Sequence, residues 1–118
     1  MAYVDGFVTP VPKNKLAEYK RVSARMGRIV RELGALEFRE CVADDVKPGK
    51  HTSFPQSVKL KRGETVLFSY IVYQSRAHRD RVMKQIMADP YFASMDPKTM
   101  PFDGKRMFWG GFKPIVSL

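Results

Sequence analysis

The segment ETVLFSYIVY, residues 64–73, constrains the fold more than any other part of this chain. It is rich in β-branched and aromatic residues, and it therefore predicts a β-strand. A strand with one solvated face alternates apolar and polar side chains, but here both alternating sets are largely apolar. The two sets are Val66, Phe68, Tyr70 and Val72, and Leu67, Ile71 and Tyr73. We therefore expect both faces of the sheet that contains this strand to be covered.

Two helices are predicted, one before and one after this strand. Apolar residues recur at helical spacing over residues 16–33, with Asn14 as the expected N-cap and Gly34 as the expected stop. After the strand, Ser75 is expected to cap a second helix that ends at Asp89, just before a proline.

The rest of the chain predicts three further strands. Two of them, residues 2–9 and 35–43, mix apolar and polar residues as half-buried strands do. Residues 54–61 are expected to extend or follow the second of these strands, and residues 91–101 are expected to be irregular. The last strand is predicted over residues 105–112.

The predicted order is β-α-β-β-α-β, which specifies a fold class. Chains with this order fold into a ferredoxin-like α+β sandwich, a four-stranded antiparallel sheet with two helices on one face. A length of 118 residues suits a single domain, residues 1–118. Since no helix remains to cover the second sheet face, we expect a second copy of the chain to cover it in a symmetric homodimer.

The composition limits the function classes. The 21 Lys and Arg residues exceed the 12 Asp and Glu residues and give a net charge of +9, which favours anionic partners. One cysteine and two histidines exclude an intrachain disulfide and a zinc ligand set, so no metal or cofactor is expected. Without a secretory signal or an apolar run of about 18 residues, we expect a cytoplasmic protein with no membrane partner.

Two alternatives arise from individual residues. Cys41 and His51 are a weak candidate for a nucleophile and its base, because nothing places them together. The RNA-recognition module shares the β-α-β-β-α-β order, and Tyr3 falls where a stacking aromatic would lie. However, Arg62-Gly63 is followed by an acidic residue instead of an aromatic one, so any binding of RNA or single-stranded nucleic acid is expected to be weak.

The segment MPFDGKRMFWGGF, residues 100–112, is the candidate site. Asp103-Gly104 predicts a tight turn, and Gly110-Gly111 within a strand predicts a bulge or a close approach of another group. The first and last strands are neighbours in a ferredoxin-like sheet, so Asp5 is expected within reach of Lys105 or Arg106. The predicted ligand-binding residues are Tyr3, Asp5, Phe7, Arg106, Met107, Trp109 and Gly110.

Two interpretations of this segment stay open. In the first, the residues form a pocket in which Asp5 is a base with a pKa raised by burial and Arg106 orients an anionic substrate. In the second, Asp5 and Arg106 form a structural ion pair and the aromatic residues are ordinary core.

Several motifs carry a family resemblance along nearly the whole chain. They are YVDGF (3–7), FSY (68–70), SRAHRD (75–80), MADP (87–90), and MPFDGKRM (100–107) followed by GGF. With these motifs the chain resembles the YbaA-like family, domain of unknown function 1428. The resemblance implies a ferredoxin-like fold of the dimeric α/β-barrel kind, in which two sheets face each other, and it implies no activity. Tyr70 stands where the family often has tryptophan, and Met83 where it often has asparagine.

The resulting functional hypothesis is a homodimer with a small-molecule cavity at the sheet face. The protein is expected to act as a binder or as a cofactor-independent enzyme on a small anionic or aromatic molecule, because folds of this kind host both. The alternative hypothesis is the weak RNA or single-stranded nucleic-acid binding module.

Overall fold

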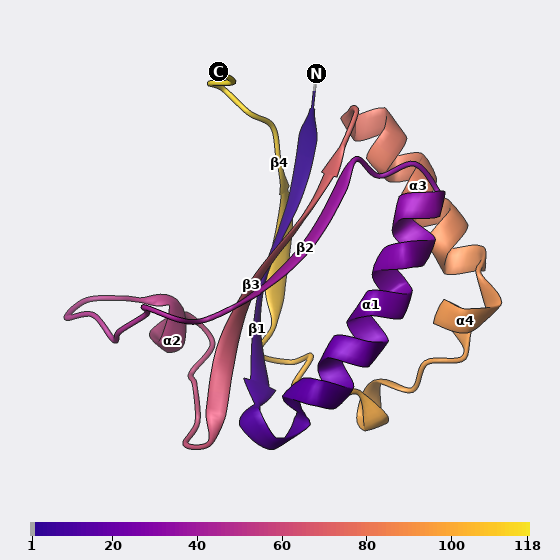
Figure 1. Ribbon diagram of the computed structural model, residues 1–118. Coiled ribbons are helices and arrows are strands. Elements are labelled where there is room, and N and C mark those ends of the chain that lie inside the picture. Colours follow the sequence, from indigo (N-terminus) through magenta and orange to yellow (C-terminus); the bar gives the residue numbers. More distant parts are fainter. Residues whose placement is uncertain (1) are drawn as a thin grey trace.

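A four-stranded antiparallel sheet with its main helices on one face forms the protein (Figure 1), in a computed structural model that describes residues 2–118. The strand order is β2-β3-β1-β4. The strands are β1 (Tyr3–Pro12), β2 (Glu37–Val42), β3 (Glu64–Tyr73) and β4 (Phe108–Phe112). The helices are α1 (Leu16–Glu32), α2 (Phe54–Ser57), α3 (Arg76–Ala88) and α4 (Pro90–Ala93), with the 3-10 turns η1 (Lys13–Lys15) and η2 (Pro97–Thr99). The predicted ferredoxin-like α+β fold is confirmed.

The ends of the helices follow the sequence signals with one exception. Gly34, at φ 110°, ends α1, and the Ser75 hydroxyl accepts a hydrogen bond from the His78 backbone N–H at 3.0 Å at the start of α3. Asp89 ends α3 and caps α4. The prediction that Asn14 caps α1 is wrong, because η1 follows β1 directly and places Asn14 inside a helical turn.

Three strands differ in length from the prediction, and one of them, β2, is shorter at both ends than the predicted residues 35–43. β1 continues through Pro10 to Pro12, because β4 pairs with β1 only from Val4 to Val8 and leaves the last residues of β1 with one neighbour. A proline whose missing N–H faces such an open edge removes no ladder hydrogen bond. β4 begins at Phe108, since the turn after Asp103 occupies the preceding residues.

Residues 54–61 do not form a strand. The Ser53 hydroxyl accepts a hydrogen bond from the Gln56 backbone N–H, and Pro55 lies in the first turn, so this segment starts the short helix α2. Val58, which follows α2, is buried in a small cluster with Val8 and Val66 on the sheet face opposite α1 and α3.

The strand register separates two sheet faces. On the helix-covered face lie Asp5 and Phe7 of β1, paired with Ile71 and Ser69 of β3. The side chains that alternate with these lie on what we call the open face, whose aromatic members are Phe68, Tyr70, Phe108 and Phe112. Phe112 is 63% exposed and Phe108 is 47% exposed. Within one chain, the helices cover one face of the sheet. The open face is covered only in part, by the segment that follows α2, so the prediction that both faces are covered holds only in part.

The outer surface of α1 carries a row of cations. Arg21, Arg25 and Arg28 are all exposed, and the Arg25 guanidinium lies 4.0 Å from the centre of the Tyr91 ring. Within residues 2–118, no helix has the length and the apolar character needed to cross a bilayer.

Candidate ligand-binding cavity

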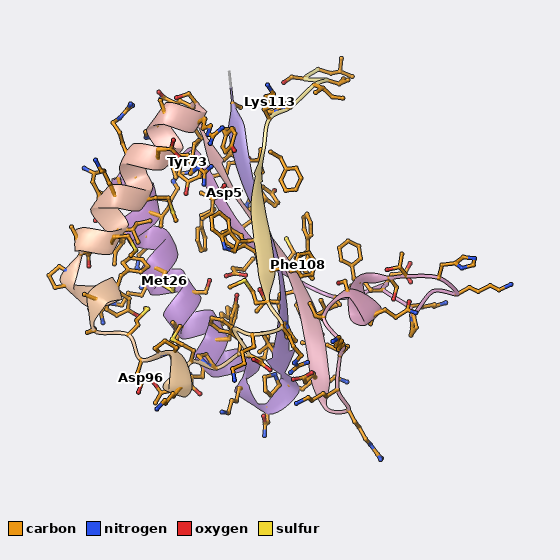
Figure 2. All side chains as sticks on the ribbon, turned by 180° about the vertical axis from the view of Figure 1, so that it is seen from behind. Asp5, Met26, Tyr73, Asp96, Phe108 and Lys113 are labelled. Carbon is orange, nitrogen blue, oxygen red and sulfur yellow. The ribbon has the colours of Figure 1, made fainter. Side chains whose placement is uncertain are left out.

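A cavity of about 270 Å³ lies between the helix-covered sheet face and the helices. Figure 2 shows Asp5 and Tyr73 on the side of the sheet where α1 carries Met26. Most of the wall is apolar, and methionine adapts readily to ligands of different shape. The apolar wall comprises Phe7, Val22, Met26, Val30, Phe38, Ile71, Met83, Ile86, Phe92, Met100, Phe102 and Met107.

Asp5 is the most unusual residue of this cavity. Its side chain is 1% exposed and lines the wall, yet neither carboxylate oxygen has a hydrogen-bond partner among residues 2–118. The buried Tyr73 hydroxyl, which also lines the cavity, has no partner there either. A buried polar group without a partner costs about 1–3 kcal/mol, more if charged, so such a group calls for a functional explanation.

Arg79 of α3 is the cation that faces Asp5 among residues 2–118, but it forms no hydrogen bond with it. Its Nη1 lies 3.6 Å from Asp5 Oδ1, while its Nη2 donates a hydrogen bond to the Tyr3 hydroxyl at 3.1 Å and its Nε lies 3.1 Å from Asp80 Oδ1. Burial raises the pKa of Asp5, Arg79 partly opposes this, and the Asp80 charge adds to it. The cavity therefore holds a carboxylate whose charge is incompletely compensated.

A second polar group of the cavity, here called the Glu40 cluster, consists of Glu40, Tyr19, Ser23 and Ser69. The Tyr19 hydroxyl donates to both Glu40 oxygens, at 2.8 and 3.0 Å, and the Ser23 hydroxyl donates to Oε2 at 2.5 Å. The Ser69 hydroxyl donates to Oε1. Burial and the Glu40 carboxylate raise the pKa of the Tyr19 phenol above its usual range.

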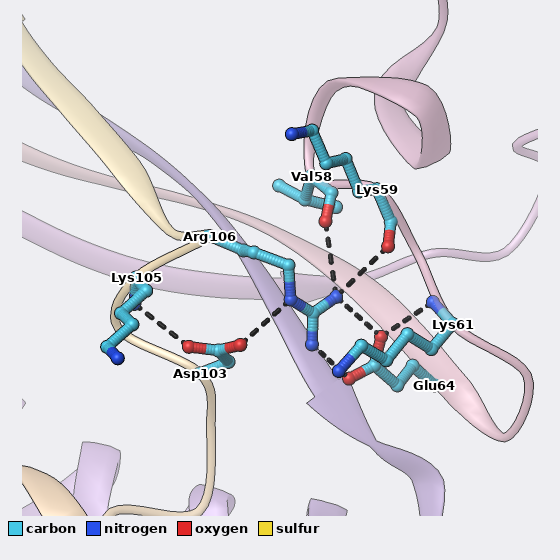
Figure 3. Close-up of polar contacts among 7 residues, drawn as sticks. All are labelled: Val58, Lys59, Lys61, Glu64, Asp103, Lys105 and Arg106. Carbon is cyan, nitrogen blue, oxygen red and sulfur yellow. Dashed lines mark hydrogen bonds and ion pairs between the residues drawn. The ribbon is translucent and has the colours of Figure 1, made fainter.

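Arg106 lies away from the cavity and does not pair with Asp5. Its guanidinium binds both Glu64 oxygens, at 2.8 and 2.6 Å, and Asp103 at 2.8 Å (Figure 3). It also donates to the backbone carbonyls of Val58 and Lys59. These contacts hold the pKa of Glu64 below its usual value.

The expected Asp5–Arg106 pair is therefore wrong, and the register explains why. Asp5 lies opposite Gly111 in the β1–β4 ladder. Arg106 precedes this residue by five positions, about 17 Å along an extended chain. Strand adjacency was predicted correctly, but the position along the strand was not.

The other predicted ligand-binding residues are divided by the structure. Phe7 and Met107 line the cavity with Asp5. Trp109 is 47% exposed and stacks on Phe7, with ring centres 5.8 Å apart. Gly110 of β4 pairs with Gly6 of β1 and does not line the cavity. A role of any of these residues in binding stays a prediction.

Tyr3 does not lie where a base-stacking residue is needed. It is 9% exposed, and the Arg79 guanidinium lies 5.0 Å from its ring centre on the helix-covered face. The β1–β4 ladder runs without a bulge, and a side chain at Gly111 would collide with the Tyr3 ring. The close approach predicted at the glycine pair is therefore present, and the group that approaches Gly111 is the Tyr3 ring.

Several cavity residues were not singled out from the sequence. They are Tyr73 and the members of the Glu40 cluster. Arg79, which contacts Asp5 from α3 but does not line the cavity, was not singled out either. Two members of the cluster carry a detectable signal, because Ser69 is a hydroxyl in the middle of an apolar strand and Ser23 lies one helical turn after Tyr19 on the apolar side of α1. Met83 of α3 also lines the cavity.

Two other predictions concern metals and thiols. Within residues 2–118, no group of three or more His, Cys, Asp and Glu side chains is arranged to hold a metal ion. Cys41 is an exposed free thiol on β2, and His51 is exposed in the loop before α2.

Comparison with solved structures finds the same fold at low identity. A NIPSNAP domain protein from Burkholderia xenovorans matches with a TM-score of 0.62 and 16% identity, covering 97% of this chain and 95% of its own. A mutant of SnoaB, a cofactor-independent oxygenase from Streptomyces nogalater, matches with a TM-score of 0.60 and 16% identity over 99% and 96%. A dimeric ferredoxin-like protein from an uncultured marine organism matches with a TM-score of 0.58 and 9% identity over 100% of both chains.

Sequence comparison gives a closer relationship. The uncharacterized protein YbaA of Escherichia coli K12 is 44% identical over 117 residues, which cover 99% of this chain and 99% of that protein. The model of the family described as "Protein of unknown function (DUF1428)" matches residues 2–104. The chain therefore belongs to the DUF1428 family, as the motifs in its sequence indicated.

Proposed function

We propose that this protein binds a small, largely apolar molecule in the cavity between the sheet and the helices, with a polar group of the ligand at Asp5. The observation that carries the proposal is the Asp5 carboxylate, which is 1% exposed and has no hydrogen-bond partner in residues 2–118 although it lines a cavity. A ligand that donates hydrogen bonds to this carboxylate would remove the cost of its burial.

The size and wall of the cavity support the same proposal. Its volume of about 270 Å³ lies just below the range of about 300–1,000 Å³ that is usual for small-molecule sites. An apolar wall with a few convergent polar groups is the usual construction of such sites. A ligand with one or two rings is the expected size.

Proton abstraction from the bound molecule is a second candidate function. The raised pKa of Asp5 favours it, because a general base works best when its pKa approaches the ambient pH. One neighbour in fold, SnoaB, is a cofactor-independent oxygenase, which is an example of chemistry that this architecture supports without a cofactor.

We also propose a homodimer in which two open faces pack against each other. Phe68, Phe108 and Phe112 leave an aromatic surface on this face, and Phe112 is 63% exposed. A structural neighbour is a dimeric ferredoxin-like protein. Burial of such a patch by a second copy would supply the missing cover of β3.

Fluorescence of Trp109 provides the test of ligand binding. Trp109 is the only tryptophan and stacks on Phe7, which lines the cavity. A screen of small aromatic molecules should find compounds that change this fluorescence saturably, and Asp5→Asn should weaken their binding at least tenfold. Asp45→Asn, a change of an exposed loop carboxylate, should leave binding unchanged.

Two results would contradict the proposal. The first is a broad screen without a saturable response. The second is a set of ligands that bind the Asp5→Asn variant as tightly as the unchanged protein while that variant remains folded.

A further inference from the structure

The charge of the cavity is opposite to that of the whole chain. The chain carries a net charge of +9, but the cavity lining contains the two carboxylates Asp5 and Glu40. The one cationic residue of the lining, among those the structure describes, is Arg39. Its side chain is 59% exposed and its Nη2 lies 3.3 Å from Glu37 Oε1, so it is largely compensated outside the cavity.

Arg79 does not neutralise the Asp5 end of the cavity. The same guanidinium faces two carboxylates, Asp5 at 3.6 Å and Asp80 at 3.1 Å. Asp80 also lies 4.0 Å from Nε of the exposed Arg76, so that carboxylate has a second cation. Asp5 has no other cation within 4 Å among residues 2–118 and accepts no hydrogen bond there, so its charge is the one that stays poorly compensated. An anionic group of a ligand at Asp5 would therefore be repelled, whereas a cation would be attracted.

The Glu40 cluster is also arranged to accept hydrogen bonds and not to donate them. Each of its three hydroxyls, on Tyr19, Ser23 and Ser69, uses its one proton toward a Glu40 oxygen. A hydroxyl that has donated its proton has only acceptor lone pairs left. The polar groups at Asp5 and at Glu40 therefore both favour a ligand that donates hydrogen bonds.

Asp5 and Glu40 lie too far apart for one small group to reach both. Asp5 and Glu40 belong to strands two positions apart, since Glu40 pairs with Ser69 and Ser69 pairs with Phe7, and they are displaced by two residues along the strands. Strand spacing and rise place their Cα atoms about 12 Å apart. The apolar body of a ligand fits between them, against Met26 and Met83.

From these observations we infer that the ligand is an amphipathic amine, whose ammonium group binds Asp5 and whose apolar body fills the methionine-rich part of the cavity. This inference rests on the proposed function and specifies its ligand class. The ammonium binds Asp5 in preference to Glu40, because Glu40 is already satisfied by three hydroxyls while Asp5 has no donor. A charge-assisted hydrogen bond there gives the orphan carboxylate its partner. The anionic ligand expected from Arg106 is not supported, since Arg106 is bound to Glu64 and Asp103.

Three probes of equal shape test the charge preference. They are 2-naphthylmethylamine, 2-naphthylmethanol and 2-naphthoate, titrated into the unchanged protein by calorimetry at pH 7. Salt at about 150 mM suppresses non-specific attraction of the anion to the basic surface. The amine should bind at least tenfold more tightly than the alcohol, and the carboxylate should show no saturable binding.

Two variants then assign the preference to Asp5. Asp5→Asn should reduce the affinity for the amine at least tenfold and that for the alcohol less than threefold, while Asp45→Asn should change neither. The comparison of the three probes needs no variant, so it stands even if Asp5→Asn does not fold. Binding of the alcohol or the carboxylate as tight as that of the amine would overturn the inference and leave the proposed function standing. Binding of none of the three probes, together with an unresponsive Trp109 screen, would overturn both.

Discussion

Replacement of Asp5 by asparagine should leave the folded protein as stable or more stable at neutral pH. The change keeps the shape of the side chain and removes a charge that is 1% exposed and has no hydrogen-bond partner in residues 2–118. Burial outweighs the attraction of Arg79, because the pKa of Asp5 is raised despite that guanidinium. Arg79 keeps its contacts with Tyr3 and Asp80 in the variant.

The expected magnitude separates the two interpretations of Asp5. A buried polar group without a partner costs about 1–3 kcal/mol, part of which the new amide retains, so we expect a gain of about 1 kcal/mol in unfolding free energy. Loss of one partner of a buried structural ion pair instead destabilises a protein by about 3–5 kcal/mol. The two interpretations therefore differ in sign and by about 4 kcal/mol or more.

The dependence on pH provides an internal check. A carboxyl whose pKa is raised on folding leaves stability unaffected below its unfolded pKa, near 3.8, and lowers stability as the pH rises toward its folded pKa. The advantage of Asp5→Asn should thus be near zero at the lowest pH at which the protein folds and should grow to a plateau above the folded pKa. Glu64, whose pKa is lowered, acts in the opposite direction, but it contributes equally to both proteins.

Urea denaturation followed by circular dichroism at several pH values between 4 and 7 measures this difference. Asp45→Asn, a change of an exposed loop carboxylate, is the control and should show only a small difference. If Asp5→Asn loses 3 kcal/mol or more at pH 7, the carboxylate is a structural group, and the reasoning that assigns it to a ligand fails.

Three further predictions concern other parts of the molecule. Arg106→Ala should lower the unfolding free energy by about 2–4 kcal/mol, because it strands the mostly buried Glu64 carboxylate, whereas the exposed Arg62→Ala should change it by less than about 0.5 kcal/mol in the same urea titration. Light scattering should give the mass of a dimer for the unchanged chain and of a monomer for Phe112→Glu; a monomeric unchanged chain would contradict the dimer. Binding of oligonucleotides, measured by anisotropy, should be weak and should disappear between about 50 and 200 mM salt, and tight binding at high salt would favour the RNA-binding alternative.

The fold was predictable because its signals are local. The helical spacing of apolar residues, Gly34 after α1 and Ser75 before α3 each act on their own segment, and together they set the order of elements. Strand 64–73 was predicted with its observed bounds because its side chains favour a β-strand almost without exception. Local signals failed where a neighbour decides the outcome, as at Pro10, which β1 accommodates because it lies beyond the end of β4.

The site was only partly predictable because it depends on register and on long-range contacts. Asp5 was singled out from the sequence and lines the cavity, and its role in binding stays a prediction. The cation that faces it was not predicted, since Arg79 reaches it from α3 across the interior. The adjacency of the first and last strands favoured Arg106, and no pattern within one strand reveals that β4 starts only at Phe108. Glu40 shows the same limit, because its three donors come from α1 and β3.

The two arginines show why one charged cluster is architecture and the other is a candidate site. Arg106 donates hydrogen bonds to two carboxylates and two backbone carbonyls. The pKa values of both acids, Glu64 and Asp103, are lowered, so the contact stabilises their ionised forms. Arg79 faces Asp5 without a hydrogen bond, and the pKa of Asp5 is raised, so this contact does not offset the cost of burying the Asp5 carboxylate. Since the two clusters share no residue, the stability effects of Asp5→Asn and Arg106→Ala should add in the double variant to within about 0.5 kcal/mol. Non-additivity larger than this would mean that the carboxylate in the cavity is held by the same network as the turn, and that Asp5 is part of the architecture after all.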